Sequence, residues 1–367
     1  MVVSVQAGLS VAPRPTGTAA RVLRAWVGVV WALTWVVGLG ASNVSAHAAP
    51  DVVVAVAPAS ASEVRTWLMR IHDAARHRNF RGTFVVTGGG VVASARIAHY
   101  FDGIDQYERS ESLDGPPRFT YRHNELVHTV WPVARVSKVE QRTLLVSFPE
   151  LLQAGDDRIV EFYDVHAEGV ERVAGHAANV LRVTPKDKLR YGYRLWADQA
   201  SGLLLRADVL GERAEVLETS AFSEVTIGVK PQPQSVLQPM KRGDGHQVLH
   251  PLLTPTQLLR EGWTLRHPAP GFRLVSCVRR PMQEAGAPEA EGPLAPAVQA
   301  IYSDRLTYVS VFIEPFDARL HTRSMLAGVG ATQTLMVQHG EWWVTVVGDV
   351  PAATLRWFAK ALELNQK

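Results

Sequence analysis

Cysteine is almost absent from this chain of 367 residues, in which Cys277 is the only one. No internal disulfide can form, so stability has to come from apolar cores large enough to do without one. Cys277 itself lies in an alternating apolar stretch. This setting favours a small core residue over a reactive nucleophile.

Catalytic and metal-binding signatures are missing as well. The chain contains no H-E-x-x-H, no G-x-S-x-G elbow, no Walker sequence and no dinucleotide fingerprint. His246 and His250 are four residues apart, but they lie in a proline-flanked stretch, which favours surface histidines over a metal site. A hydrolase would need a convergent set of acid, base or nucleophile that the sequence does not display. We therefore expect no enzyme, no cofactor and no metal.

Acidic residues are missing from the first 50 positions, where Arg14, Arg21 and Arg24 are the only Lys, Arg, Asp or Glu residues. Without residues 1–48, the chain has 38 − 3 = 35 Lys and Arg against 35 Asp and Glu. This neutral balance removes the main argument for nucleic acid or another polyanion as a partner.

An apolar run, Ala25 to Ala41, follows these arginines and leads to Ala46-His47-Ala48. The order of charge, apolar run and small residues is typical of a secretory signal peptide with its cleavage site. We interpret residues 1–48 as an N-terminal extension and signal peptide. An uncleaved membrane anchor is the alternative, because the run is just long enough to span a bilayer.

Period-two alternation predicts a large antiparallel sheet within residues 62–229. In Leu189 to Leu210, two alternating runs flank the small and polar residues Asp198 to Gly202, which is typical of a hairpin. About nine or ten short strands of this kind favour one highly curved sheet. The triple glycine Gly88–Gly90 is interpreted as a β-turn, because neither a P-loop lysine nor a helix follows it.

An amphipathic helix is predicted from Ser62 to Asn79, with Ser62 as its N-cap and Val64, Leu68 and Ile71 on its apolar face. We expect helices to cover the concave face of the sheet. The predicted fold class is α+β, with a large antiparallel, incompletely closed β-barrel covered by helices. Such an arrangement leaves an apolar cavity between sheet and helix.

Prolines separate this part from the C-terminal third. Residues 230–255 contain five prolines and a polar stretch that cannot continue a sheet or helix, so we predict an interdomain linker. Residues 256–367 predict a smaller α+β domain with two hairpins, whose turns lie at Ser303–Arg305 and Gln338–Gly340. A C-terminal helix is expected to start near Pro351.

Aromatic and basic side chains are frequent on the predicted large sheet. Either the aromatic residues form the sheet core and the arginines a solvated face, or the aromatic residues line a lipid cavity that arginines rim. Alternation alone leaves both interpretations open. The lipid-cavity candidates are Phe84, Tyr100, Tyr107, Phe119, Tyr191, Tyr193 and Trp196, and the candidates for anionic groups or a partner are Arg96, Arg109, Arg118, Arg190 and Arg194.

Six stretches, in their order along the chain, resemble the MucB/RseB family. They cover both predicted domains, from about residue 62 to 365, and they are NFRGTFVV (79–86), YERSESLDGPPR (107–118), the run 170–206, PGF (270–272), YVSVFIEP (308–315) and VVGDVPAATL (346–355).

The resemblance implies a periplasmic regulator of an extracytoplasmic stress sigma factor. Such a protein binds the periplasmic part of a membrane-bound anti-sigma factor and shields it from regulated proteolysis, until lipopolysaccharide or lipoprotein acyl chains release the block. The resemblance also implies a large domain similar to LolA and LolB. A periplasmic lipid or lipoprotein carrier is the alternative, although a carrier does not need the second domain. The oligomeric state stays open, a homo-oligomer included.

Overall fold

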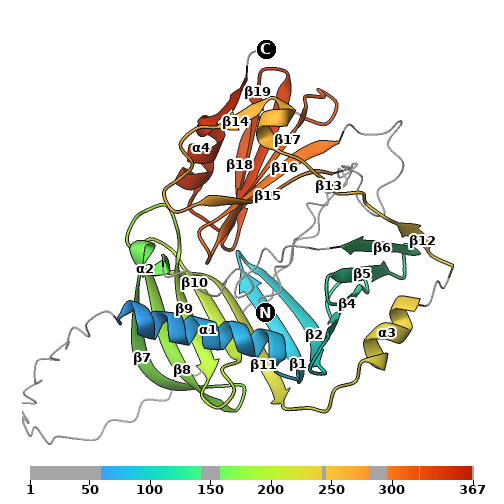
Figure 1. The fold of residues 1–367 in the computed structure, drawn as a ribbon, viewed down its shortest axis with the longest axis vertical. Helices are drawn as coiled ribbons and strands as arrows, with labels where there is room; N and C mark the ends of the chain where they lie inside the picture. The colour runs from blue at the N-terminus through green and yellow to red at the C-terminus, as the bar shows by residue number, and fades with distance from the viewer. Residues whose placement is uncertain (1–58, 142–157, 242–244, 281–295, 322, 366–367) are drawn as a thin grey trace, which may run out of the picture. The chain divides into compact units, whose positions relative to one another are not determined.

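The computed structural model describes residues 59–141, 158–241, 245–280, 296–321 and 323–365 (Figure 1). All of them belong to one compact unit, Ala57–Lys367. The predicted signal peptide and its alternative, the membrane anchor, lie outside the described residues. Within the described ranges, none of the helices is both long and apolar enough to cross a membrane.

Helix α1 (Ala61–His77) confirms the predicted amphipathic helix, but its N-cap is Ser60 and not Ser62. The Ser60 hydroxyl accepts from the Glu63 N–H, and the Glu63 carboxylate accepts from the Ser60 N–H at 2.9 Å. This reciprocal capping box satisfies two backbone donors of the first turn, which Ser62 cannot do. Val64, Leu68 and Ile71 are buried against Tyr193 and Leu195 of the large sheet.

The large sheet has twelve strands in the order β12-β6-β5-β4-β3-β2-β1-β11-β10-β9-β8-β7. Its neighbouring strands are antiparallel except for β12 and β6, and the sheet is open because β12 and β7 form its two edges. The strands are β1 (Phe80–Gly88), β2 (Val91–Phe101), β3 (Gln106–Ser112), β4 (Phe119–His123), β5 (Leu126–Trp131), β6 (Val136–Gln141), β7 (Tyr163–Val173), β8 (His176–Pro185), β9 (Gly192–Asp198), β10 (Leu204–Leu210), β11 (Val216–Ile227) and β12 (Gln247–Leu249). The short helix α2 (Ile159–Phe162) leads directly into β7.

The hairpin predicted for 189–210 is formed by β9 and β10, but β9 starts at Gly192. Leu189 leaves the ladder because its N–H donates to Asp187 and its carbonyl accepts from the Thr354 hydroxyl at 2.6 Å. The side chain of Arg190 is fully buried. Contacts distant in sequence therefore override the alternating pattern at these residues.

The stretch 230–255 was predicted to lack helix and sheet, and this prediction is wrong. Helix α3 (Gln234–Lys241) packs Val236 against tyrosines of β2, β3 and β4. Strand β12 extends the large sheet, whereas β13 (Thr254–Pro255) pairs with the small sheet. Pro239 lies inside α3, and Pro255 lies in the edge strand β13, where a missing N–H donor is tolerated.

The small sheet has seven strands in the order β13-β15-β16-β17-β20-β19-β18. The two predicted hairpins are confirmed as β16–β17 and β19–β20, and Pro351 is the N-cap of the C-terminal helix. Helix α4 buries Leu355 and Phe358 in the core of this part. The remaining elements are η1 (Leu258–Glu261), β14 (Trp263–Leu265), β15 (Arg273–Arg280), β16 (Ala297–Ser303), β17 (Tyr308–Pro315), β18 (Met325–Val329), β19 (Thr332–His339), β20 (Trp342–Gly348), α4 (Ala352–Ala361) and β21 (Leu362–Leu364). The α+β class, with an open large sheet and a C-terminal helix, agrees with the prediction.

Candidate functional site at the Arg190–Asp304 junction

The seven aromatic lipid-cavity candidates all lie on or directly before strands of the large sheet, and six of them are buried. They do not converge on one place. Phe84 and Trp196 belong to one core cluster, Tyr193 belongs to a second with α1, and Tyr100 and Tyr107 belong to a third with α3. Phe119 is half-buried at the edge of the third cluster, and Tyr191 is buried just before β9. Their role in binding lipid stays a prediction.

The arginine candidates have different environments. Arg96 and Arg109 both pair with Glu111, at 3.1 and 3.5 Å. Arg194 pairs with Glu168 and Glu171, and its guanidinium lies 4.8 Å from the centre of the Trp196 ring. Arg118 is half-buried beside the turn before β4. Arg190 differs from the other four because it is buried at the contact between the large and small sheets.

Asp304 occupies the tight turn between β16 and β17. Its Oδ1 accepts from the N–H groups of Leu306 and Thr307, at 3.0 and 2.9 Å, which is the local turn that aspartate favours. Its Oδ2 accepts from the Tyr163 hydroxyl of β7 at 2.8 Å. One carboxylate thus both shapes a turn of the small sheet and connects it to the large sheet.

Arg190 approaches the same carboxylate oxygen, with 3.5 Å between its Nη1 and Oδ2 of Asp304. Both side chains are fully buried, so this ion pair is not screened by water as a surface pair would be. The guanidinium also contacts Asp187 at 3.3 Å and lies over the rings of Phe162 and Phe272. Buried charges of this kind persist only where partners compensate for lost hydration.

Burial raises the pKa of Asp304, whereas Arg190 and the backbone donors of the turn act in the opposite direction. Burial also raises the pKa of Tyr163 well above its ordinary value, with the Asp304 charge as the second cause. Tyr163 therefore remains a hydroxyl donor at neutral pH. An ionised Asp304 can accept the hydrogen bonds from Leu306, Thr307 and Tyr163 at the same time.

The Pro270-Gly271-Phe272 stretch, part of the family resemblance, completes the junction. The Pro270 carbonyl accepts from Arg190, and Phe272 supplies one of the rings over the guanidinium. Gly271 has a φ of +83°, and a Cβ at this position would lie 2.8 Å from the Phe162 ring. Only glycine fits this backbone conformation and this close approach without strain.

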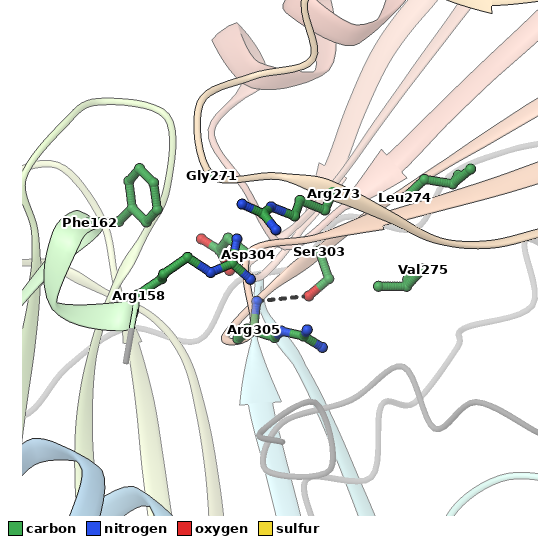
Figure 2. A pocket seen from close by; sticks show the side chains of 9 residues that line it. All are labelled: Arg158, Phe162, Gly271, Arg273, Leu274, Val275, Ser303, Asp304 and Arg305. Carbon is green, nitrogen blue, oxygen red and sulfur yellow. Dashed lines mark hydrogen bonds between the residues drawn. The ribbon is translucent and has the colours of Figure 1, made fainter. Parts of the chain in front are cut away.

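A cavity of about 120 Å³ opens beside Asp304 (Figure 2). Its lining includes three basic side chains, Arg158, Arg273 and Arg305. Phe162 of α2 and Leu274 and Val275 of β15 supply its apolar wall. In Figure 2, Arg158 and Arg273 extend from opposite sides of the cavity toward each other. A cavity of this volume can accommodate only a small group.

A second contact joins the two sheets at the glycine-rich turn between β1 and β2. A Cβ on Gly88 would lie 3.1 Å from the Cα of Gly330, and one on Gly89 would lie 2.5 Å from the Gly330 nitrogen. The interpretation of the triple glycine as a β-turn is confirmed, since Gly89 and Gly90 form the turn of the β1–β2 hairpin. Its glycines also allow two backbones to pack closely.

Two carboxyl groups lie near this second contact. Glu218 of β11 accepts from the backbone of Ala331, and the buried Asp349 accepts from the Thr332 hydroxyl at 2.6 Å. Burial, and secondly the Asp349 charge, raise the pKa of Glu218 to about 7. In the part of the chain that the structure describes, no group of three metal-ligating side chains is close enough to hold a metal ion.

Sequence reasoning identified Arg190 but missed Tyr163, Arg158, Arg273 and the role of Asp304. Ser303–Arg305 was interpreted only as a turn, because an aspartate in a turn is ordinary and its burial does not show in the sequence. The nearest signal was the resemblance itself, since three of its stretches, 170–206, 270–272 and 346–355, contain Arg190, Gly271 and Thr354.

Comparison with known families covers both parts of the chain. The model of the MucB/RseB N-terminal domain matches residues 63–240, and that of the MucB/RseB C-terminal domain matches residues 257–363. The first of these matches includes helix α3 except its last residue, within the stretch that was predicted to be a linker.

Individual proteins agree with this assignment. The sigma factor AlgU regulatory protein MucB of Pseudomonas aeruginosa is 30% identical over 319 residues, 82% of this chain and 91% of that protein. The sigma-E factor regulatory protein RseB of Escherichia coli K12 is 24% identical over 300 residues, 81% of this chain and 90% of that protein.

Two solved structures have a similar fold. The P. aeruginosa MucA/MucB complex matches with a TM-score of 0.63 and 26% identity, covering 83% of this chain and all of the matched chain. A structure of MucB in complex with MucA(peri) matches with a TM-score of 0.61 and 27% identity, covering 84% of this chain and all of the matched chain. The chain belongs to the MucB/RseB family.

Proposed function

We propose that this protein is a periplasmic regulator that binds the periplasmic part of a membrane-bound anti-sigma factor. In the bound state it shields that segment from regulated proteolysis, and lipid or lipopolysaccharide signals release it. Export through the signal peptide predicted in residues 1–48 places the protein in the periplasm.

The observation that carries this proposal is the match to MucB structures solved with MucA, which extends over both sheets of this chain. The match supports binding of the anti-sigma segment and does not bear on the lipid signal. The regulator needs two states with different affinities, because a ligand shifts a conformational equilibrium only by its differential affinity for the two states.

We expect the two states to differ in the contacts between the two sheets. Arg190 and Asp304 form one contact, and Gly89 and Gly330 form the other. If acyl chains bind more tightly to an arrangement in which these contacts are altered, they lower the affinity for the anti-sigma segment by the same coupling free energy.

Binding calorimetry tests the proposal. Residues 49–367 are titrated with the periplasmic segment of the organism's own anti-sigma factor, with and without lipopolysaccharide. Specific binding that lipopolysaccharide weakens is the expected result. Absence of binding under every condition would contradict the regulator and favour a periplasmic lipid or lipoprotein carrier.

Protection from proteolysis is measured with the same components. The anti-sigma segment is exposed to its first regulatory protease, with and without this protein, and the rate of cleavage is followed. We expect slower cleavage in the presence of the protein and recovery of the rate on addition of lipopolysaccharide. Cleavage at an unchanged rate would remove the shielding role while leaving the binding role intact.

A further inference from the structure

We propose that acidification releases helix α3 from the large sheet, with His128 as the residue that senses the pH. His128 lies on β5 and is 6% exposed. Its ring donates a hydrogen bond to the backbone of Met240, near the end of α3. The attachment of α3 therefore includes a side chain of the type that changes its charge near neutral pH. This inference goes beyond the proposed function and does not rest on it.

Helix α3 covers an aromatic surface of the large sheet. Three tyrosines from β2, β3 and β4 form this surface, namely Tyr100, Tyr107 and Tyr121. Val236 of α3 is buried in the same cluster, and Met240 packs against it. Figure 1 shows α3 beside β4. Release of α3 would expose these rings to solvent.

The second ring nitrogen of His128 has no compensating contact. Nε2 is buried, and it has no hydrogen-bond partner among the residues that the structure describes. In the neutral ring, Nδ1 carries the proton that is donated to Met240, and Nε2 is an acceptor. Protonation converts Nε2 into a charged donor that is buried without an acceptor. This costs more free energy than an unpaired neutral nitrogen.

The groups closest to His128 do not compensate for a positive charge. His246 and His250, which flank β12, interact with His128 electrostatically, and histidines also become positive in acid. Across the sheet, His128 is paired with Tyr121 of β4 and Val139 of β6, neither of which is charged near neutral pH. On α3, the residue after Met240 is Lys241, which is itself positive and exposed.

Charged residues on the neighbouring strands have partners of their own. On β3, Arg109 lies opposite Tyr121 and pairs with Glu111 at 3.5 Å. On β6, Lys138 and Glu140 alternate with the residue opposite His128, so they point to the other face of the sheet, and they pair at 2.9 Å. A protonated His128 thus gains no carboxylate from these strands.

The direction of the pH effect follows from these contacts. Burial lowers the pKa of His128 from its ordinary 6.5, His246 and His250 add to this effect, and the hydrogen bond to Met240 opposes it. Once α3 is released and the ring is hydrated, its pKa returns toward the ordinary value, so the released state binds more protons. The contribution of His128 to holding α3 is therefore complete above pH 6.5 and is lost as the pH falls below it.

Hydrogen exchange followed by mass spectrometry tests the release on residues 49–367. Exchange is measured at about pH 8 and about pH 5, on either side of the ordinary histidine value, and is corrected for the intrinsic exchange rate at each pH. We expect peptides from α3 to lose protection at the lower pH, whereas peptides from α4 keep theirs. Retained protection in α4 distinguishes release of α3 from global unfolding.

His128→Asn separates the titration from the contact, because the asparagine amide can donate to Met240 but cannot become charged. This variant should keep the protection of α3 at both pH values. His267→Asn makes the same change at an exposed position with a φ of +55°, which asparagine tolerates, and should lose protection as the original protein does. His246→Asn/His250→Asn should lose less protection than the original protein, because the charges that repel His128 are gone.

Equal corrected protection of α3 at the two pH values overturns the proposal. A loss of protection in His128→Asn that equals the loss in the original protein overturns it as well. Thermal unfolding at about pH 8 shows whether each variant is folded. If His128→Asn is not folded, the variant His246→Asn/His250→Asn decides, and a loss equal to that of the original protein then contradicts the proposal.

Discussion

The Tyr163 hydroxyl donates a 2.8 Å hydrogen bond to Oδ2 of Asp304, although the two residues are 141 positions apart. Tyr163 begins β7 at the edge of the large sheet, and Asp304 lies in a turn of the small sheet. Arg190 faces the same oxygen from the segment between β8 and β9. A single buried carboxylate therefore connects both sheets. Substitution of Asp304 is thus a direct test of the contact between them.

We predict that Asp304→Ala lowers the free energy of unfolding by about 3–5 kcal/mol, because it removes the fully buried partner of Arg190 and leaves only the partly exposed Asp187. Urea unfolding followed by tryptophan fluorescence measures the change. Asp164→Ala, on strand β7 next to Tyr163, is the control, since the half-exposed pair of Asp164 with Lys186 should contribute less than about 1 kcal/mol.

A double-mutant cycle separates the ion pair from its surroundings. Arg190→Met combined with Asp304→Asn should cost clearly less than the sum of the two single changes, since neither charge is then left alone. Strict additivity of the two changes would show that the residues do not act as a pair.

The glycine-rich turn between β1 and β2 gives a second prediction, in which the neighbouring glycine serves as the control. Gly89→Ala and Gly90→Ala both place alanine at a positive φ, +58° and +79°, which costs about 1–2 kcal/mol in either case. Only the Gly89 Cβ also collides with the backbone of Gly330, so Gly89→Ala should cost about 1–3 kcal/mol more. Equal midpoints of urea unfolding for the two variants would show that the turn does not pack against Gly330.

Local sequence patterns correctly predicted the elements that are determined by neighbouring residues in the sequence. The two hairpins of the small sheet, the C-terminal helix and the face of α1 that carries Val64 and Leu68 follow from alternation, turn residues and helical spacing. The predicted N-cap Ser62 was wrong, because Ser60 forms the capping box with Glu63.

Elements that depend on distant partners were not predictable. The stretch 230–255 forms α3 and β12 because the tyrosine cluster and the edge of β6 offer surfaces that no local pattern reveals. Arg190 interrupts an alternating run because Asp304 holds it from another sheet. The cavity arginines come from three separate segments, so only the folded chain shows them as a group.

Arg109 and Arg118, two of the candidates for anionic groups or a partner, flank the turn of the resemblance stretch 107–118. We predict that the variant Arg109→Ala/Arg118→Ala binds acyl-chain ligands with affinity lower by about tenfold, as expected when two charged donors to an acidic headgroup are removed. Fluorescence titration with a lipopolysaccharide probe measures this. Arg319→Ala, which removes an exposed arginine from the connection between β17 and β18, is the control. An unchanged affinity in the double variant would remove these two residues from the lipid site.

The acid pair near Gly330 predicts how stability depends on pH. The pKa of Glu218 is raised to about 7 from an ordinary 4.5, first by burial and then by Asp349, so the folded protein binds more protons than the unfolded chain between these values. The free energy of unfolding contributed by this group is highest below pH 4.5, falls as the pH rises to about 7, and is then constant.

Glu218→Gln should remove this slope, since the amide cannot ionise. Urea unfolding across this pH range should give a difference between variant and original protein that grows by about 1–2 kcal/mol, reduced because Glu218 is only half-buried. Glu224→Gln, at an exposed position of the same strand β11, should leave the slope as it is. Parallel stability curves for the original protein and Glu218→Gln would mean that Glu218 is exposed to solvent and does not contact the β18–β19 turn. The second contact between the sheets would then be open in solution.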